Sequence, residues 1–100
     1  MDSGAAILQE LILKVSKGNP GAMMCCMEMM KHSKGDLNVV LAIKRAEHLG
    51  IIGDKLYLVW NDCCDRDSKK TLRVLMEKGK DEILDHIDVM KHGGMGKAFD

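Results

Sequence analysis

The sequence predicts an all-α protein, a compact orthogonal bundle of five to six short helices, and three observations lead to this prediction. Only three of the 100 residues are aromatic and β-branched residues are few, although β-sheets favour both types. Amphipathic segments end repeatedly at glycines, as helices do when their last turn closes on a left-handed residue. The connections between these segments are only about two to five residues long, so consecutive helices are expected to be neighbours in space.

The first two helices are expected over residues 4–17 and 20–32. Ser3 is the expected N-cap of the first helix. The second helix begins at a helix-start motif, Asn19-Pro20-Gly21, because asparagine caps well and proline loses no hydrogen bond at the first helical position. The predicted buried stripe of this second helix consists of Met23, Cys26 or Met27, and Met30.

Four further helices complete the predicted bundle. Asp36 is expected to cap a helix that ends near residue 49, and the wide apolar face of that helix suits a central, buried position. Asp54 is expected to cap the next helix, and the polar residues 61–67 are expected to form a turn. The fifth helix is expected to begin at 67 or 68 and the sixth at 80 or 81. The expected left-handed residues at helix ends are Gly18, Gly35, Gly50 and Gly79.

The length of the chain predicts a single helical domain over residues 1–92, followed by a flexible C-terminal tail over residues 93–100. The tail contains three glycines and has no periodic apolar face. A domain of this size buries only ~65% of the surface of its extended chain. Modest stability is therefore expected unless a partner covers part of the surface.

Fifteen basic residues balance fifteen acidic residues, so the formal net charge is zero when the histidines are neutral. Proteins that coat nucleic acid or an anionic membrane normally carry a basic surplus, and this balance argues against both classes. The N-terminus has no basic region ahead of a continuous apolar stretch, and no run reaches the ~20 apolar residues of a membrane span. The sequence therefore predicts a cytoplasmic protein without membrane association.

Four cysteines occur as two adjacent pairs, Cys25-Cys26 and Cys63-Cys64. Without a secretory signal, these thiols are expected to stay free in a reducing compartment. Neighbouring residues of a helix point ~100° apart, so only one member of each pair can face a given direction. One member of each pair is therefore expected to fill space in the core.

Two glycine-bounded segments carry a resemblance to a group of small proteins. One predicted helix opens with Gly18-Asn19-Pro20-Gly21-Ala22, and a later one opens with Gly50-Ile51-Ile52-Gly53-Asp54-Lys55-Leu56. This pattern, which extends over residues 18–80, resembles uncharacterised small helical proteins of Firmicutes and their phages. The resemblance implies a small intracellular helical protein. The group has no known activity, so it implies no site residues.

Residues 37–62 have the spacing of a helix-turn-helix, which makes a DNA-binding regulator the alternative function. Ala46, Gly50 and Ile51 lie where such a motif needs a close helix approach, a turn and an apolar contact. The positions that would face DNA are apolar or acidic instead of basic or amide-bearing, so nucleic acid is a disfavoured partner. These positions are Ile52, Gly53, Asp54, Tyr57 and Leu58.

A small metal or redox protein is the third hypothesis. The segment 23–30 contains thioether and thiol sulfur atoms that suit Cu(I), but methionine at helical spacing more commonly fills cores or adaptable surfaces. Adjacent cysteines do not match the ligand spacing of structural zinc sites, and neither do His86 and His92. The acidic segment 62–67 lacks the glycine turn and the distal glutamate of a calcium loop, so helix capping explains it better. No metal or other cofactor is predicted.

No phosphate-binding loop and no nucleophile motif occurs in the sequence, so no catalytic residue is assigned and the protein is predicted not to be an enzyme. Six apolar-faced helices in a short chain carry more hydrophobic surface than one small core needs. The sequence therefore predicts a protein–protein interaction module that self-associates, as a homodimer for example, through an apolar, methionine-rich surface. The residues expected on that surface are Met24, Met29, Tyr57 and Leu58.

Overall fold

The computed structural model describes residues 3–33, 36–91 and 99, and all regular elements among them are helical. The predicted all-α bundle of short helices is therefore confirmed. The elements are α1 (Ser3–Ser16), α2 (Pro20–Ser33), α3 (Leu37–Leu49), α4 (Asp54–Leu58), the π-helical segment η1 (Val59–Cys63), α5 (Ser68–Glu77) and α6 (Lys80–Lys91).

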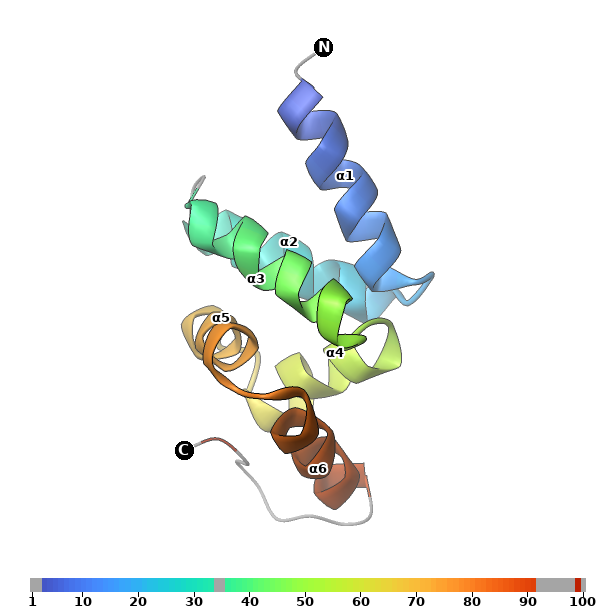
Figure 1. Cartoon of the computed structure of the whole chain (residues 1–100), viewed down its shortest axis with the longest axis vertical. Coiled ribbons are helices and arrows are strands. Elements are labelled where there is room, and N and C mark those ends of the chain that lie inside the picture. The colour runs from blue at the N-terminus through green and yellow to red at the C-terminus, as the bar shows by residue number, and fades with distance from the viewer. Residues whose placement is uncertain (1–2, 34–35, 92–98, 100) are drawn as a thin grey trace.

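The helices are arranged so that α1 lies at one end of the molecule and α6 at the other (Figure 1). α1 packs on α2 and α3, α2 packs on α4 and α5, and α3 packs on α5. The segment η1 follows α4 directly and packs on α6. The radius of gyration of the Cα atoms is 12.8 Å, close to the ~13 Å expected for a compact chain of this length.

The core lies where α2, α3, α5 and the α4–η1 segment meet. Burying one large aliphatic side chain contributes about 1.5–3 kcal/mol, so these contacts supply most of the stability. The guanidinium of Arg66 lies 4.8 Å from the ring centre of Trp60, a cation–π contact at the edge of the core. The largest fully buried side chains include Trp60, Met29, Ile43, Ile51, Leu56, Leu75 and Ile83.

Two aspartates and two glycines set helix boundaries as predicted. Asp36 accepts a hydrogen bond from the backbone N–H two residues later (2.9 Å), and Asp67 accepts one from the N–H three residues later (3.0 Å). These caps satisfy N–H groups that have no partner within the first helical turn. Gly18 and Gly50 have φ angles of 77° and 76°, the left-handed conformation expected after α1 and α3.

The end of α5 differs from the prediction that Gly79 adopts a left-handed conformation there. Lys78 is the C-cap and has an extended backbone (φ −86°, ψ 148°), and the φ of Gly79 is not positive. Arg45 of α3 donates hydrogen bonds from Nη1 to the carbonyl oxygens of Leu75 (2.6 Å) and Lys78 (2.7 Å). A side chain from another helix thus donates hydrogen bonds to carbonyl oxygens at the end of α5. In other helices, a left-handed glycine lets backbone N–H groups make such bonds. Gly35 lies outside the described residues.

The fourth helix is shorter than predicted and begins differently. Gly53, with a φ of 57°, precedes it, and Asp54 is its first helical residue instead of its cap. The helix then continues as η1, whose π-helical turns are wider than α-helical turns. Residues 61–63 are therefore helical and do not belong to the predicted turn. An i→i+5 turn brings residues four and five apart closer to one face than an α-helical turn does. The residues that face inward are Val59, Trp60, Cys63 and Cys64.

The buried face of α2 is rotated from the predicted one: of the predicted stripe, Cys26 is buried as expected, but the prediction is wrong for the methionines. Met27 is 60% exposed, and Met23 and Met30 are only partly buried. The observed inner face is mostly small, which lets α2 approach α4 and α5 closely. The segment is apolar on almost every side, so hydrophobic periodicity could not select the correct face. The residues buried along this face are Ala22, Cys25, Cys26 and Met29.

α2 approaches α4 closely at Gly21. A Cβ atom at this position would overlap the Cδ1 and Cε1 atoms of the Tyr57 ring. Tyr57 in turn meets Trp60 edge-on, with 6.3 Å between the ring centres. Packing therefore requires a glycine at this position of the helix-start motif.

The predicted division into a domain over residues 1–92 and a tail over residues 93–100 stays a prediction. Residues 92–98 and 100 lie outside the described residues. Phe99 is described, and it is buried with its ring centre 4.1 Å from that of His86 on α6. This ring contact removes apolar surface from water at the side of α6.

Replacing Gly21 with alanine is expected to lower the free energy of unfolding by about 1–2 kcal/mol, because overpacking against Tyr57 outweighs the gain in helix propensity. Urea denaturation followed by circular dichroism measures the change. Gly79→Ala is the matched control, because a Cβ there meets open space, and it should leave stability unchanged or raise it by up to ~1 kcal/mol. In a Tyr57→Ala background the penalty should disappear, and a penalty that persists contradicts the contact.

Candidate functional site

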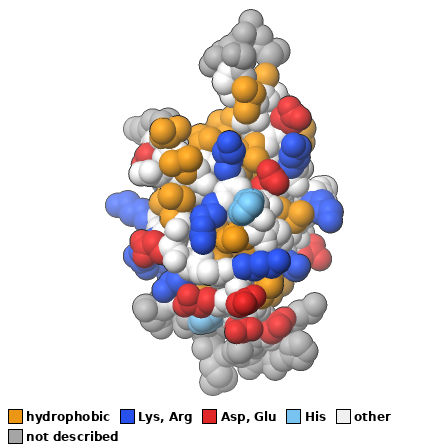
Figure 2. All heavy atoms as spheres, viewed as in Figure 1, with side chains coloured by type: hydrophobic (Ala, Val, Ile, Leu, Met, Phe, Trp, Pro, Cys, Tyr) orange, Lys and Arg blue, Asp and Glu red, His pale blue; other side chains and the backbone are white. Residues whose placement is uncertain are grey.

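Large apolar side chains remain exposed on the three N-terminal helices. In the part of the chain that the structure describes, the large hydrophobic side chains with exposed fractions of 43% to 68% all belong to α1, α2 and α3. Figure 2 shows hydrophobic side chains gathered over this end of the molecule, with charged side chains predominating over the other end. Exposed large apolar side chains gathered at one end of a molecule indicate that this end includes a contact surface. The exposed side chains are Ile7 and Leu13 of α1, Met24 and Met27 of α2, and Leu37 and Leu41 of α3.

One groove, about 530 Å³ in volume, runs between α1 and α2, and we name it the α1–α2 groove. Three of its lining residues are methionines of α2 that lie outside the fully buried face of this helix, and one of them, Met30, also packs against the core. Flexible thioether side chains adapt well to irregular partner surfaces. The apolar lining consists of Ile12, Leu13, Met23, Met27 and Met30, and the polar lining of Gln9 and Lys31.

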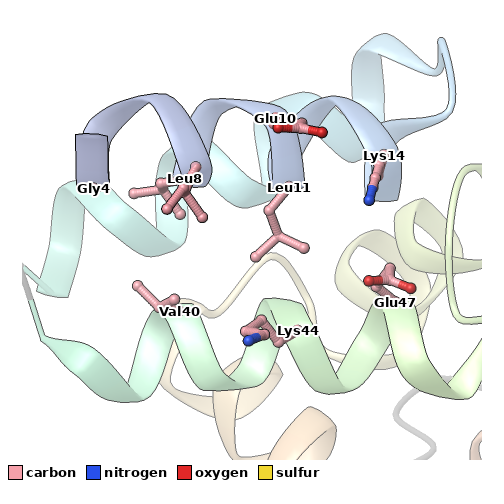
Figure 3. Close-up of a pocket in the computed structure, with 9 residues that line it drawn as sticks. Gly4, Leu8, Glu10, Leu11, Lys14, Val40, Lys44 and Glu47 are labelled. Atoms are coloured by element: carbon pink, nitrogen blue, oxygen red, sulfur yellow. The ribbon is translucent and has the colours of Figure 1, made fainter. Parts of the chain in front are cut away.

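A second groove, about 500 Å³ in volume, runs between α1 and α3, and we name it the α1–α3 groove (Figure 3). Leu11 of α1 points toward α3, and Val40 of α3 points toward α1. Four charged side chains also line this groove, and none of them forms an ion pair with another described residue. They are Glu10 and Lys14 of α1 and Lys44 and Glu47 of α3.

The structure does not bring the four predicted surface residues together. Met29 is fully buried, because it belongs to the inward face of α2, so its assignment to the surface is wrong. Tyr57 and Leu58 are half-buried and pack against the core. Met24 is exposed as predicted, but it lines neither groove.

The exposed residues of α1 were not identified from the sequence, although a signal for one of them exists. Leu13 lies two positions after Leu11, which places it ~200° around the helix from the buried face. Ile7 lies four positions before the buried Leu11, and so on a similar side of the helix, yet it is 66% exposed because α3 covers only part of α1. The sequence therefore shows that α1 has more apolar side chains than one buried face needs. It does not show which faces of α1 the other helices leave uncovered.

The helix-start motif joins α2 to α4. Asn19 caps α2 as predicted, since its Oδ1 accepts a hydrogen bond from the N–H of Ala22 (3.1 Å). The Asn19 Nδ2 donates to Oδ1 of Asp54 (2.8 Å), at the start of α4. Pro20 occupies the first helical position, also as predicted. Together with the contact between Gly21 and α4, these bonds give the motif a structural role.

All four cysteines are buried as free thiols, so the prediction that only one member of each pair lies in the core is wrong. α2 packs against neighbours on more than one side, and the wide turn of η1 directs both Cys63 and Cys64 inward. Burial raises the thiol pKa to about 12 at Cys26 and to about 11 at Cys63 and Cys64, and it also raises the pKa of Cys25. Thiols held in the protonated form are poor nucleophiles and poor metal ligands at neutral pH.

Among the residues that the structure describes, no group of three or more His, Cys, Asp or Glu side chains is placed to hold a metal ion. In the segment 23–30, Cys25, Cys26 and Met29 are buried in the core, Met23, Met27 and Met30 line the α1–α2 groove, and Met24 is exposed outside it. In the acidic segment 62–67, Asp67 caps α5, and the hydrogen bond that it accepts from the N–H of Lys70 lowers its carboxyl pKa. His92 lies outside the described residues.

The predicted helix-turn-helix does not present a free recognition helix. α4 is five residues long before η1 begins, and it packs on α2. Of the five positions predicted to face DNA, only Asp54 is exposed, and a carboxylate repels phosphate. The geometry therefore adds no support to the DNA-binding hypothesis.

No family model, no curated protein and no solved structure matches this chain. The resemblance to small proteins of Firmicutes and their phages therefore stays a prediction. None of the described helices has the length and apolar character that crossing a membrane requires. What the chain does is inferred from its two grooves and from the charges beside them.

Asn19→Ala is expected to lower the free energy of unfolding by about 1–2 kcal/mol, since it removes both the cap of α2 and the hydrogen bond to Asp54. Asn19→Ser retains a capping hydroxyl and loses only the bond to Asp54, so its cost should be about 1 kcal/mol or less. Both variants are compared with the wild type by urea denaturation. A serine variant as stable as the wild type would show that the Asp54 bond contributes nothing.

Stability is expected to fall as the pH rises above 9.0, the ordinary pKa of the thiols, which remain protonated in the folded state until pH 11 or higher. In this window the unfolded state has released protons that the folded state retains, so unfolding becomes more favourable. The loss approaches about 1.4 kcal/mol per pH unit for each titrating thiol. Urea midpoints measured from neutral to alkaline pH test this, and Cys26→Ala should reduce the slope. An unchanged slope in this variant contradicts the assignment.

Proposed function

We propose that this protein is a non-enzymatic protein–protein interaction module that self-associates through the apolar surface on both sides of α1. The observation that supports this function best is the exposure of Ile7, Leu13 and Met27 beside two apolar grooves. Large apolar side chains that stay exposed beside apolar grooves are typical of surfaces that bind a partner. The methionines of the α1–α2 groove suit such a surface because they adapt to a partner.

A second copy of the chain suits this surface for two reasons. The formal net charge is zero, so two copies do not repel each other at long range. A chain of 100 residues buries only about two-thirds of its extended surface, so an interface adds stability that the core alone does not supply. Each large aliphatic side chain that moves from water into the interface contributes about 1.5–3 kcal/mol.

The proposed location is the cytoplasm. All four thiols are free, which suits a reducing compartment, and their burial among core residues indicates that they act as small hydrophobic groups. This environment is compatible with an interaction module that carries no redox chemistry.

Sedimentation velocity from micromolar to millimolar concentration is expected to show a dimer or a larger species. Ile7 lines the α1–α3 groove and Leu13 lines the α1–α2 groove. At least one of Ile7→Asp and Leu13→Asp should therefore weaken self-association roughly a hundredfold or more, because a symmetric dimer loses the apolar side chain twice. Met24→Asp is the matched control, since Met24 is exposed but lines neither groove. A wild-type protein that stays strictly monomeric overturns the proposed function, and so does a Met24→Asp variant as impaired as the other two.

A further inference from the structure

The four charges of the α1–α3 groove alternate in sign around it. α1 and α3 run in the same direction on its two sides (Figure 3). Glu10 lies at the level of Lys44, and Lys14 lies at the level of Glu47 one helical turn further along. Each acidic residue therefore has one basic residue across the groove and another beside it on its own helix.

This arrangement is complementary to itself. In a twofold dimer the same patch serves both copies, so every contact between two different residues occurs twice. When the twofold axis runs along the groove, α1 of one copy lies over α3 of the second copy. Glu10 then faces Lys44 of the second copy, and Lys14 faces Glu47 of the second copy. All four contacts across the interface join opposite charges.

A twofold axis could run along the groove or across it. The exposed apolar side chains favour the axis along the groove. With the axis along the groove, Ile7 of one copy covers the part of α3 that contains Leu37 and Leu41, so three of the exposed apolar side chains bury one another. An axis across the groove also pairs opposite charges, but it directs Ile7 toward the exposed Lys17 at the far end of α1. Apolar contact therefore selects the axis along the groove.

We infer that two copies pair about a twofold axis along the α1–α3 groove, with α1 of each copy on α3 of the other and Glu10 paired with Lys44 across the interface. This interface presupposes the proposed self-association and identifies the surface that carries it. Within the described residues the four charges have no ion-pair partners to give up. The apolar contacts supply the affinity, and the charges fix the register and orientation of the two copies.

The test is a charge-reversal cycle read out by sedimentation equilibrium at low salt. Glu10→Lys and Lys44→Glu should each raise the dimer Kd on the order of tenfold or more, because each places like charges together twice in the dimer. The variant with both reversals restores opposite charges and should return the Kd close to that of the wild type. Glu77→Lys and Lys80→Glu, which are exposed and outside the groove, are controls for the change in net charge.

The outcomes that overturn this interface differ from the outcome that overturns self-association. Single reversals that act no more strongly than their controls exclude the groove charges from the interface. Rescue of Glu10→Lys by Lys14→Glu instead of Lys44→Glu shows an axis across the groove. Dissociation by Leu13→Asp with no effect of Ile7→Asp moves the contact to the α1–α2 groove and leaves the proposed function intact. A strictly monomeric wild type overturns both proposals.

Discussion

The close approach of α2 to α4 and α5 is the constraint on which the rest of the structure depends. The inner face of α2 is built mostly from small side chains, and Gly21 has no Cβ atom to meet the ring of Tyr57. Asn19 fixes the same contact from the start of the helix through its hydrogen bond to Asp54. Once this face is inside, the geometry of a helix turns Met27 outward, beside α1. The cysteines of α2 thus fill the core with Met29, while Met23, Met27 and Met30 line a groove.

α1 has apolar side chains on more faces than α2 and α3 can cover. Leu11 and Val15 are buried against these two helices, whereas Ile7 and Leu13 stay exposed. The result is a groove on each side of one helix, both located at the end of the molecule farthest from α6. A helix that is apolar on several faces gains stability in water when further surface covers it. A second copy of the chain brings such a surface at no cost in long-range charge repulsion, because the net charge is zero.

The starts of several helices, and the ends of others, could be read from the sequence, because their causes are local. Asn19, Asp36 and Asp67 cap helices through hydrogen bonds to backbone groups two or three residues away. Gly18 and Gly50 end helices through a backbone angle that other residues rarely adopt. The short loops between these boundaries then make consecutive helices neighbours, which is why the all-α bundle could be predicted from the pattern alone.

The sequence by itself thus determined most of the helical segments, although not the helical residues 61–63, and it showed that the chain has an excess of apolar surface. Only the tertiary structure decided where that surface lies, since the orientation of each helix depends on residues far along the chain. Arg45 closes the end of α5 from 30 residues away, and Asp54 holds Asn19 from 35 residues away. Residues 22–30 are apolar on nearly every side, so no periodic signal distinguishes their inner face. Met29 is buried because the packing of α2 among α1, α4 and α5 places its face inside, and that packing exists only in the folded chain.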